Sequence, residues 1–178
     1  IKNEFPCFTL RNITKEDILY FKKQGFIAKY IGEAITKDNL YEASVMLNLF
    51  PVNALEGNVL SNYNIVTVKS YTMGEVKFYG QGAGKLPTAN AIVQDIFDII
   101  DNINYHTVNI EKEYKYSSNL LKHKYVLRFN EKVESEKIEK IDNDNGRYYC
   151  YTKEITQKEL LDLIGSSDCL VTKLSEEL

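Results

Sequence analysis

The chain has 178 residues, of which 44% are hydrophobic and 26% charged, and its formal net charge is −3. These values describe a soluble globular protein with one ordinary domain or two small ones. The acidic balance without a basic cluster argues against nucleic acid and anionic membranes as partners, and no run of 18 apolar residues predicts a membrane span. A start at Ile1 rather than Met, without a signal peptide, favours a segment of a longer protein.

The first half of the chain predicts one helix and four strands. Thr14 and Asp17 have the spacing of a capping box, so a helix should begin there and end at Gly25. Short polar connections between the strands that follow favour antiparallel neighbours over helical crossovers. These strands are expected at Phe26–Ile35, Ala43–Phe50, Asn62–Ser70 and Glu75–Tyr79.

A glycine-rich loop follows the fourth strand. Gly80, Gly82 and Gly84 stand at alternate positions, and Pro87 suits the first turn of a helix from Thr88 to Ile100. A glycine loop that leads into a helix N-terminus can bind an anion through free N–H groups and the helix dipole. The spacing is neither the dinucleotide fingerprint nor a P-loop, so the loop alone leaves two interpretations open: an anion site, or only a tight turn.

The helix after the loop carries a broad apolar stripe that should be buried against more than one element. Asp95, Asp98 and Asp101 recur at every third position. They allow two interpretations, a metal site or a solvated helix face, and the solvated face is favoured.

The last third of the chain reads as a linker followed by a second small unit. Residues 105–122 are polar and predict a linker, and residues 123–178 predict the order β-α-β-α-β. The second helix has a capping box of Thr156 and Glu159. The expected elements are strand Tyr125–Phe129, helix Glu131–Ile141, strand Arg147–Ile155, helix Thr156–Ile164 and strand Cys169–Leu174.

The cysteines and histidines predict no metal centre. Cys7, Cys150 and Cys169 are widely spaced and odd in number, which favours reduced thiols of a cytoplasmic protein. His106 and His123 have no ligand-type residue at metal-binding spacing and are expected to be surface or hydrogen-bonded side chains.

The segment around the glycines closely resembles homoserine dehydrogenases. The stretch Met73–Asp95, continued by Phe97, Asp98 and Ile99, follows the family pattern V-G-E-x-x-x-Y-G-x-G-A-G-x-x-P-T-A-x-A-V-V-x-D-x-x-D-I. Looser agreement extends back to Ile13, so the resemblance covers about the first hundred residues. The sequence departs from the family where Asn53 and Ala54 replace His and Pro, and where Ser61 and Ile65 replace Gly and Ala.

The resemblance implies an enzyme that reduces aspartate semialdehyde, a small-molecule substrate, to homoserine with NADP or NAD, in threonine and methionine biosynthesis. The family's Rossmann motif and its catalytic Asp and Lys stand upstream of the matching region, so no catalytic residue can be placed here. Gly80, Gly82 and Gly84 match the loop that approaches the cofactor. Glu75 matches a residue expected to support that loop, and Lys85 a variable position without a catalytic role.

The resemblance also implies assembly and a domain plan. The strands over residues 26–79 match the region through which family subunits pair, which implies a homodimer. Residues 1–104 would be the C-terminal part of the catalytic and dimerisation region, 105–122 a linker, and 123–178 a reduced ACT-like domain with one strand missing. The fold class is therefore α+β: a mostly antiparallel β-sheet with packed helices, followed by a small ferredoxin-like or ACT-like α/β unit.

Two functional interpretations remain. The first is a C-terminal fragment of an NAD(P)-dependent homoserine dehydrogenase, inactive in isolation. The alternative is a non-catalytic regulatory or dimerisation module in which the glycine loop is kept only for packing. The tail departs from ACT ligand sites because Asn130–Ser135 contains neither Pro nor Gly, which favours a structural role over effector binding.

Overall fold

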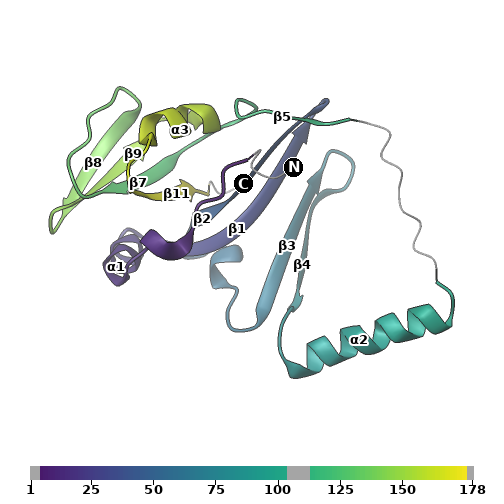
Figure 1. The fold of residues 1–178 in the computed structure, drawn as a ribbon. Helices are drawn as coiled ribbons and strands as arrows, with labels where there is room; N and C mark the ends of the chain where they lie inside the picture. Colours follow the sequence, from purple (N-terminus) through teal and green to yellow (C-terminus); the bar gives the residue numbers. More distant parts are fainter. Residues whose placement is uncertain (1–4, 104–112, 176–178) are drawn as a thin grey trace. The chain divides into compact units, whose positions relative to one another are not determined.

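The computed structural model describes residues 5–103 and 113–175 (Figure 1). The chain divides into two compact units, one made of segments 1–57 and 112–178 and the other of residues 58–111. Among the described residues, no helix is long and apolar enough to cross a membrane.

A seven-stranded mixed sheet forms the first unit. Its strands follow the order β1-β2-β11-β7-β9-β8, and β5 pairs separately with β2. Strand β2 is parallel to β11 and to β5, and the other neighbours are antiparallel. The strands are β1 Phe26–Lys37, β2 Leu40–Pro51, β5 Lys115–Tyr116, β7 Tyr125–Phe129, β8 Ile138–Asp144, β9 Arg147–Thr152 and β11 Leu170–Leu174. A separate pair joins β6 Lys122–His123 to β10 Ile155–Thr156.

Two helices of this unit begin where their capping boxes predict. In α1 (Lys15–Lys23) the Thr14 N–H donates to Asp17 Oδ2 at 2.9 Å, and Gly25 follows the helix with φ +84°. In α3 (Gln157–Ile164) the Thr156 N–H donates to Glu159 Oε2 at 2.9 Å. These local predictions are confirmed because each box satisfies its own helix's free N–H groups.

The tail differs from the predicted order. The helix expected at Glu131–Ile141 is wrong: this region contains a loop and then β8. Asn145 and Gly146 have φ of +52° and +82°, so they form a two-residue hairpin turn that pairs β8 with β9. Backbone pairing against β9 outweighs the helix propensity of the charged residues. The expectation of a missing strand is also wrong, since β7, β8, β9 and β11 pair in the ferredoxin-like order β11-β7-β9-β8. Among the described residues, the tail lacks only the helix expected between β7 and β8.

The two faces of the sheet bury separate hydrophobic clusters. Helix α3 packs through Leu160 and Ile164 against Met46, Leu127 and Val171. The opposite cluster joins α1 to β2 and three tail strands, and its buried members are Tyr20, Phe21, Leu47, Leu49, Val126, Tyr149 and Leu170. Alternation along β7, where Val126 and Leu127 face different clusters, places one helix on each face.

A buried carboxylate joins the first segment of the chain to the tail. Asp17 is fully buried and accepts hydrogen bonds from Arg128 Nε at 3.2 Å, Tyr149 OH at 2.8 Å and Arg147 Nη1 at 3.3 Å. Burial alone would raise the pKa of Asp17, but hydrogen bonds from Thr14 and Tyr149 and the Arg128 charge bring it below its ordinary value. The ionised form of Asp17 is therefore the one that the fold stabilises.

Further polar contacts repeat this connection. Lys173 on β11 pairs with Glu33 on β1, and His123 Nε2 lies 3.4 Å from the buried carboxylate of Glu42 on β2. The domain boundaries predicted at 104/105 and 122/123 stay predictions. The predicted linker lies partly outside the described residues, as does His106, and its residues 115–116 form β5.

The second unit contains a hairpin and one long helix. Strands β3 (Tyr63–Ser70) and β4 (Gly74–Gln81) pair antiparallel, as predicted, and α2 (Lys85–Ile100) follows the glycine loop. Helix α2 begins three residues before the predicted Thr88, which makes Pro87 its third residue. The prolyl nitrogen is tolerated there because the first-turn N–H groups have no partner within the helix.

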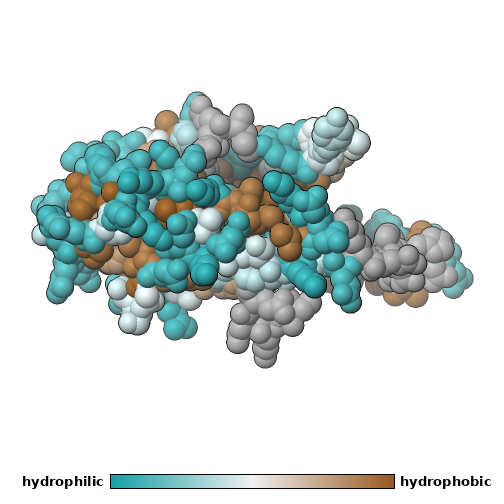
Figure 2. Space-filling model, turned by 90° about the horizontal axis from the view of Figure 1, so that it is seen from above, coloured by the Kyte–Doolittle hydropathy of each residue, from teal (hydrophilic) through white to brown (hydrophobic). Residues whose placement is uncertain are grey.

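The apolar stripe of α2 is exposed rather than buried. Ile92, Ile96 and Phe97 are 50–56% exposed and Ile99 is 76% exposed. Asp98, expected on a solvated face, is instead buried and accepts a hydrogen bond from Gln94 Nε2 at 2.8 Å. Figure 2 shows one face of the chain, on which hydrophobic patches interrupt a mostly hydrophilic surface.

Candidate functional site

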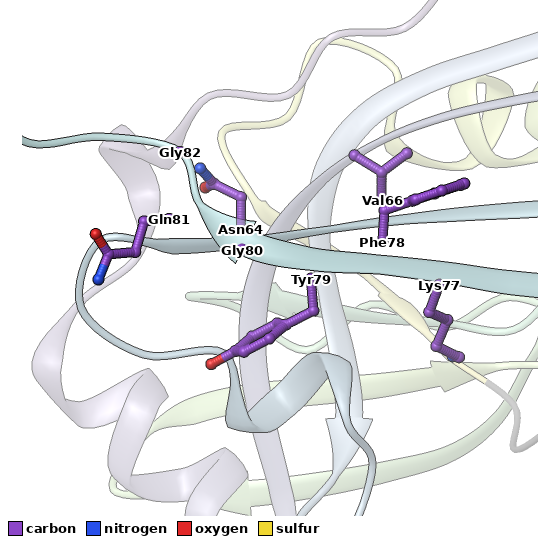
Figure 3. Close-up of a pocket in the computed structure, with 8 residues that line it drawn as sticks. All are labelled: Asn64, Val66, Lys77, Phe78, Tyr79, Gly80, Gln81 and Gly82. Atoms are coloured by element: carbon purple, nitrogen blue, oxygen red, sulfur yellow. The ribbon is translucent and has the colours of Figure 1, made fainter. Parts of the chain in front are cut away.

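The candidate site lies where β4 runs into the glycine loop and α2 begins. An open pocket on the hairpin adjoins this loop (Figure 3). It is lined by Asn64, Val66, Lys77, Phe78, Tyr79, Gly80, Gln81 and Gly82. Every lining residue comes from the hairpin or the loop, so the second unit alone builds this pocket.

The two faces of the hairpin differ in character. Val66 and Phe78 project from one face, where they are 58% and 61% exposed, and Lys77 and Tyr79 project from the other (Figure 3). Tyr79 stacks on Tyr63 with ring centroids 5.0 Å apart. Large apolar side chains this exposed are typical of a surface that meets a ligand or another protein part.

Gly84 has a conformational reason to be glycine. Its φ of +118° lies in a region that side chains with a Cβ rarely adopt, and it is the N-cap of α2. No side chain caps α2, in contrast to α1 and α3. The first turn of α2 therefore presents its N–H groups and the positive end of the dipole without a capping side chain, and Lys85 adds a cation.

Gly82 has a steric reason to be glycine. A Cβ at this position would lie 1.5 Å from the amide end of the Asn64 side chain. In the orientation that satisfies this amide, its oxygen accepts from Gly82 N–H at 3.2 Å and its nitrogen donates to the Tyr63 carbonyl at 3.3 Å. Asn62 makes a second contact with the loop, since its Nδ2 donates to the Ala83 carbonyl at 2.8 Å.

Gly80 has no such reason within the described structure. Its φ is not positive, and a Cβ built on it would meet nothing within 4 Å. It pairs with Asn64 in the hairpin, on the same face as Val66 and Phe78. Of the three predicted glycines, Gly80 is therefore the one whose missing side chain leaves open space.

Glu75 lies near the start of β4, whereas Lys85 is the first residue of α2. Glu75 stands near the hairpin turn and binds Lys69 at 2.8 Å and Lys77 at 3.0 Å. Hydrogen bonds from these two lysines lower the pKa of Glu75. Its bonds are therefore to neighbours on the hairpin, about 16 Å along β4 from Gly80 at the usual strand rise.

Asn62 and Asn64 are the site residues that sequence reasoning missed. Both stand about twenty positions before the loop that they contact, and only the pairing of β3 with β4 brings them to it. The available signal was a pair of asparagines, two positions apart, at the start of the strand that precedes the one leading into the glycine loop. Among the residues that the structure describes, no group of three His, Cys, Asp or Glu side chains is arranged to hold a metal.

Comparison with known proteins gives the chain its relatives. The sequence profile of homoserine dehydrogenase matches residues 2–97. The homoserine dehydrogenase of Bacillus subtilis is 36% identical over 94 residues, which is 53% of this chain and 22% of that protein. That of Neisseria gonorrhoeae is 38% identical over 98 residues, again 53% and 22%. The chain thus spans about a fifth of the length of these relatives.

Solved structures extend the likeness through the tail. A homoserine dehydrogenase from Thiobacillus denitrificans aligns with 96% of this chain and 48% of its own, with a TM-score of 0.71 at 21% identity. One from S. aureus aligns with 93% of this chain and 45% of its own, with a TM-score of 0.58 at 22% identity. These likenesses confirm the α+β fold with its mostly antiparallel sheet. With more than half of its residues matched by the profile, the chain belongs to the homoserine dehydrogenase family.

Proposed function

We propose that this chain is the C-terminal part of an NAD(P)-dependent homoserine dehydrogenase. The parent enzyme would reduce aspartate semialdehyde to homoserine in the cytoplasm, on the route to threonine and methionine. The observation that carries the proposal is the family match over residues 2–97, which includes the entire glycine loop. The nicotinamide cofactor supplies the hydride, and the family's catalytic Asp and Lys would stand upstream of this chain.

Within that enzyme, Gly80, Gly82 and Gly84 would line the approach to the cofactor. Open space at Gly80 admits a ligand, and the uncapped first turn of α2 offers N–H groups to an anionic part of it. Exposed Phe78 supplies an apolar surface beside the same opening. These residues bind and orient, and no proton transfer is assigned to them.

The isolated chain should show no dehydrogenase activity and no measurable affinity for NADPH. One loop and one helix end supply few contacts, and association alone costs on the order of 4–15 kcal/mol. Isothermal titration of the chain with NADPH checks this, with the longer parent enzyme as the positive control. Micromolar binding by the 178-residue chain would overturn the expectation.

A homodimer is the second expected property. Exposed apolar side chains on the hairpin and the unpaired edges of β1, β3 and β4 would be covered by a second copy about a two-fold axis. Sedimentation at micromolar concentration should give twice the 20.5 kDa chain mass. A single monomeric species under those conditions contradicts the expectation.

We further propose that residues 123–178 are a reduced ACT-like unit that binds no amino-acid effector. A charged loop stands where ACT-like units have their first helix, and in it Lys132 Nζ and Glu134 Oε1 already pair at 2.5 Å. Millimolar threonine should leave the activity of the parent enzyme unchanged in a steady-state assay. Inhibition that disappears with the tail would show that the tail does bind an effector.

The alternative function is a non-catalytic regulatory or dimerisation module. One observation favours it: Gly82 and Gly84 each have a reason to be glycine within the hairpin and helix alone. The coding sequence upstream of Ile1 decides between the two. A Rossmann fingerprint and a G-x-D-A-A-R-K segment would support the enzyme, whereas an unrelated domain would support the module.

A further inference from the structure

The glycine loop is held by a side chain from the opposite strand rather than by its own residues. Asn64 reaches across the hairpin, accepts from the Gly82 N–H and donates to the Tyr63 carbonyl. The space for its amide exists only because residue 82 lacks a Cβ. We infer that Asn64 and Gly82 are a matched pair and that Asn64 is a positioning residue for the ligand of the glycine loop. The inference rests on the proposed function and deepens it.

The pair acts on the part of the loop that leads into α2. Gly82 N–H also donates to the Asn62 carbonyl at 3.0 Å, and the Asn62 side chain holds the Ala83 carbonyl. Gly84 then enters the helix with its positive φ. The backbone from Gly82 to Gly84 is therefore held by these bonds before any ligand arrives, and the first-turn N–H groups of α2 have no capping side chain. Because the loop is already ordered, ligand binding loses less conformational entropy than it would with a disordered loop.

The steric conflict between a Cβ at residue 82 and the Asn64 amide makes the pair testable by substitution. The clash that a Cβ at residue 82 would create is with the far end of a flexible side chain. Gly82→Ala should therefore displace the Asn64 amide rather than unfold the hairpin, and so should have the same effect as removing that amide. Gly82 has no positive φ, so alanine adds no backbone strain there.

The first experiment measures hydrogen exchange of the backbone N–H of residue 82 by NMR in the 178-residue chain. Asn64→Ala and Gly82→Ala should each accelerate exchange by about fivefold. The double variant should show the same fivefold change, because both changes remove one contact. Gly80→Ala is the matched control, since its Cβ meets nothing, and it should leave the exchange of Gly82 unchanged. Additive effects of Asn64→Ala and Gly82→Ala, or no effect of either, would overturn the matched pair.

The second experiment separates positioning from the proposed function in the longer parent enzyme. Asn64→Ala should raise the KM for the nicotinamide cofactor by about five- to tenfold and leave kcat within about twofold. Gly80→Val, which fills the open space beside its cross-strand partner Asn64, should also raise this KM. If Gly80→Val raises the KM and Asn64→Ala does not, the positioning role is wrong. If neither changes it while the exchange pattern holds, the matched pair stands and the cofactor role of the loop is wrong.

Discussion

Replacing Asp17 with asparagine should lower the free energy of unfolding by about 3–5 kcal/mol. Asp17 is fully buried and Arg128 is 7% exposed, so the substitution leaves a buried guanidinium without its counter-ion. It also weakens the acceptor of the Tyr149 hydroxyl and of the Thr14 capping box. Urea denaturation at pH 7 measures the change.

Two variants control this measurement. Asp162 is exposed on α3, so Asp162→Asn should change the free energy of unfolding by less than about 0.5 kcal/mol. Adding Arg128→Met to Asp17→Asn should recover part of the loss, because the unpaired buried charge is then gone. Equal effects of Asp17→Asn and Asp162→Asn would show that the buried network does not stabilise the fold.

The effect of Asp17 should also depend on pH. Its pKa is lower in the folded chain than its ordinary value, so unfolding takes up a proton once the pH approaches the ordinary aspartate range. The stabilisation is therefore fully present above that range and is lost as the pH falls through the folded pKa. The difference between the natural chain and Asp17→Asn should shrink between neutral and strongly acidic pH, as denaturation curves at several pH values would show.

Deleting residues 123–178 should abolish cooperative unfolding of the remaining chain. Strand β2 would lose β11, one of its two parallel partners, and the buried cluster under α3 would keep only Met46 of its fully buried members. The cluster under α1 would lose Val126, Tyr149 and Leu170. Removing contacts on both faces of β2 far exceeds the marginal stability of an ordinary domain. Thermal unfolding followed by circular dichroism checks the result.

The complementary deletion is the control. Replacing residues 58–111 by a flexible Gly/Ser linker of similar length removes the second compact unit and leaves the sheet with all its strands. That variant should still unfold in one cooperative transition. A cooperative transition in the chain that lacks residues 123–178 would instead show that the first segment folds without the tail.

Local sequence signals predicted the elements whose stabilising contacts lie within a few residues. The capping boxes at Thr14 and Thr156 and the turn glycine Gly25 all stand where expected. The alternating strands of the first half and the long match around Gly80 gave the fold class and the family, which the comparisons confirm. The roles of Gly80, Gly82 and Gly84 toward a cofactor stay predictions.

Contacts between distant residues account for the differences. The charged residues before Asp144 form a strand because they pair with β9. The sequence of either strand by itself does not predict this pairing. Asn64 meets Gly82 only because β3 and β4 pair, although eighteen positions separate them in the chain. Asp17 was readable as a helix-capping residue, but its burial against Arg128 depends on a sheet that joins both ends of the chain. The sequence by itself determined the local geometry of helix ends and turns, and the family to which the chain belongs. Strand pairing decided which polar groups are buried together, because burial depends on neighbours that sequence spacing does not specify.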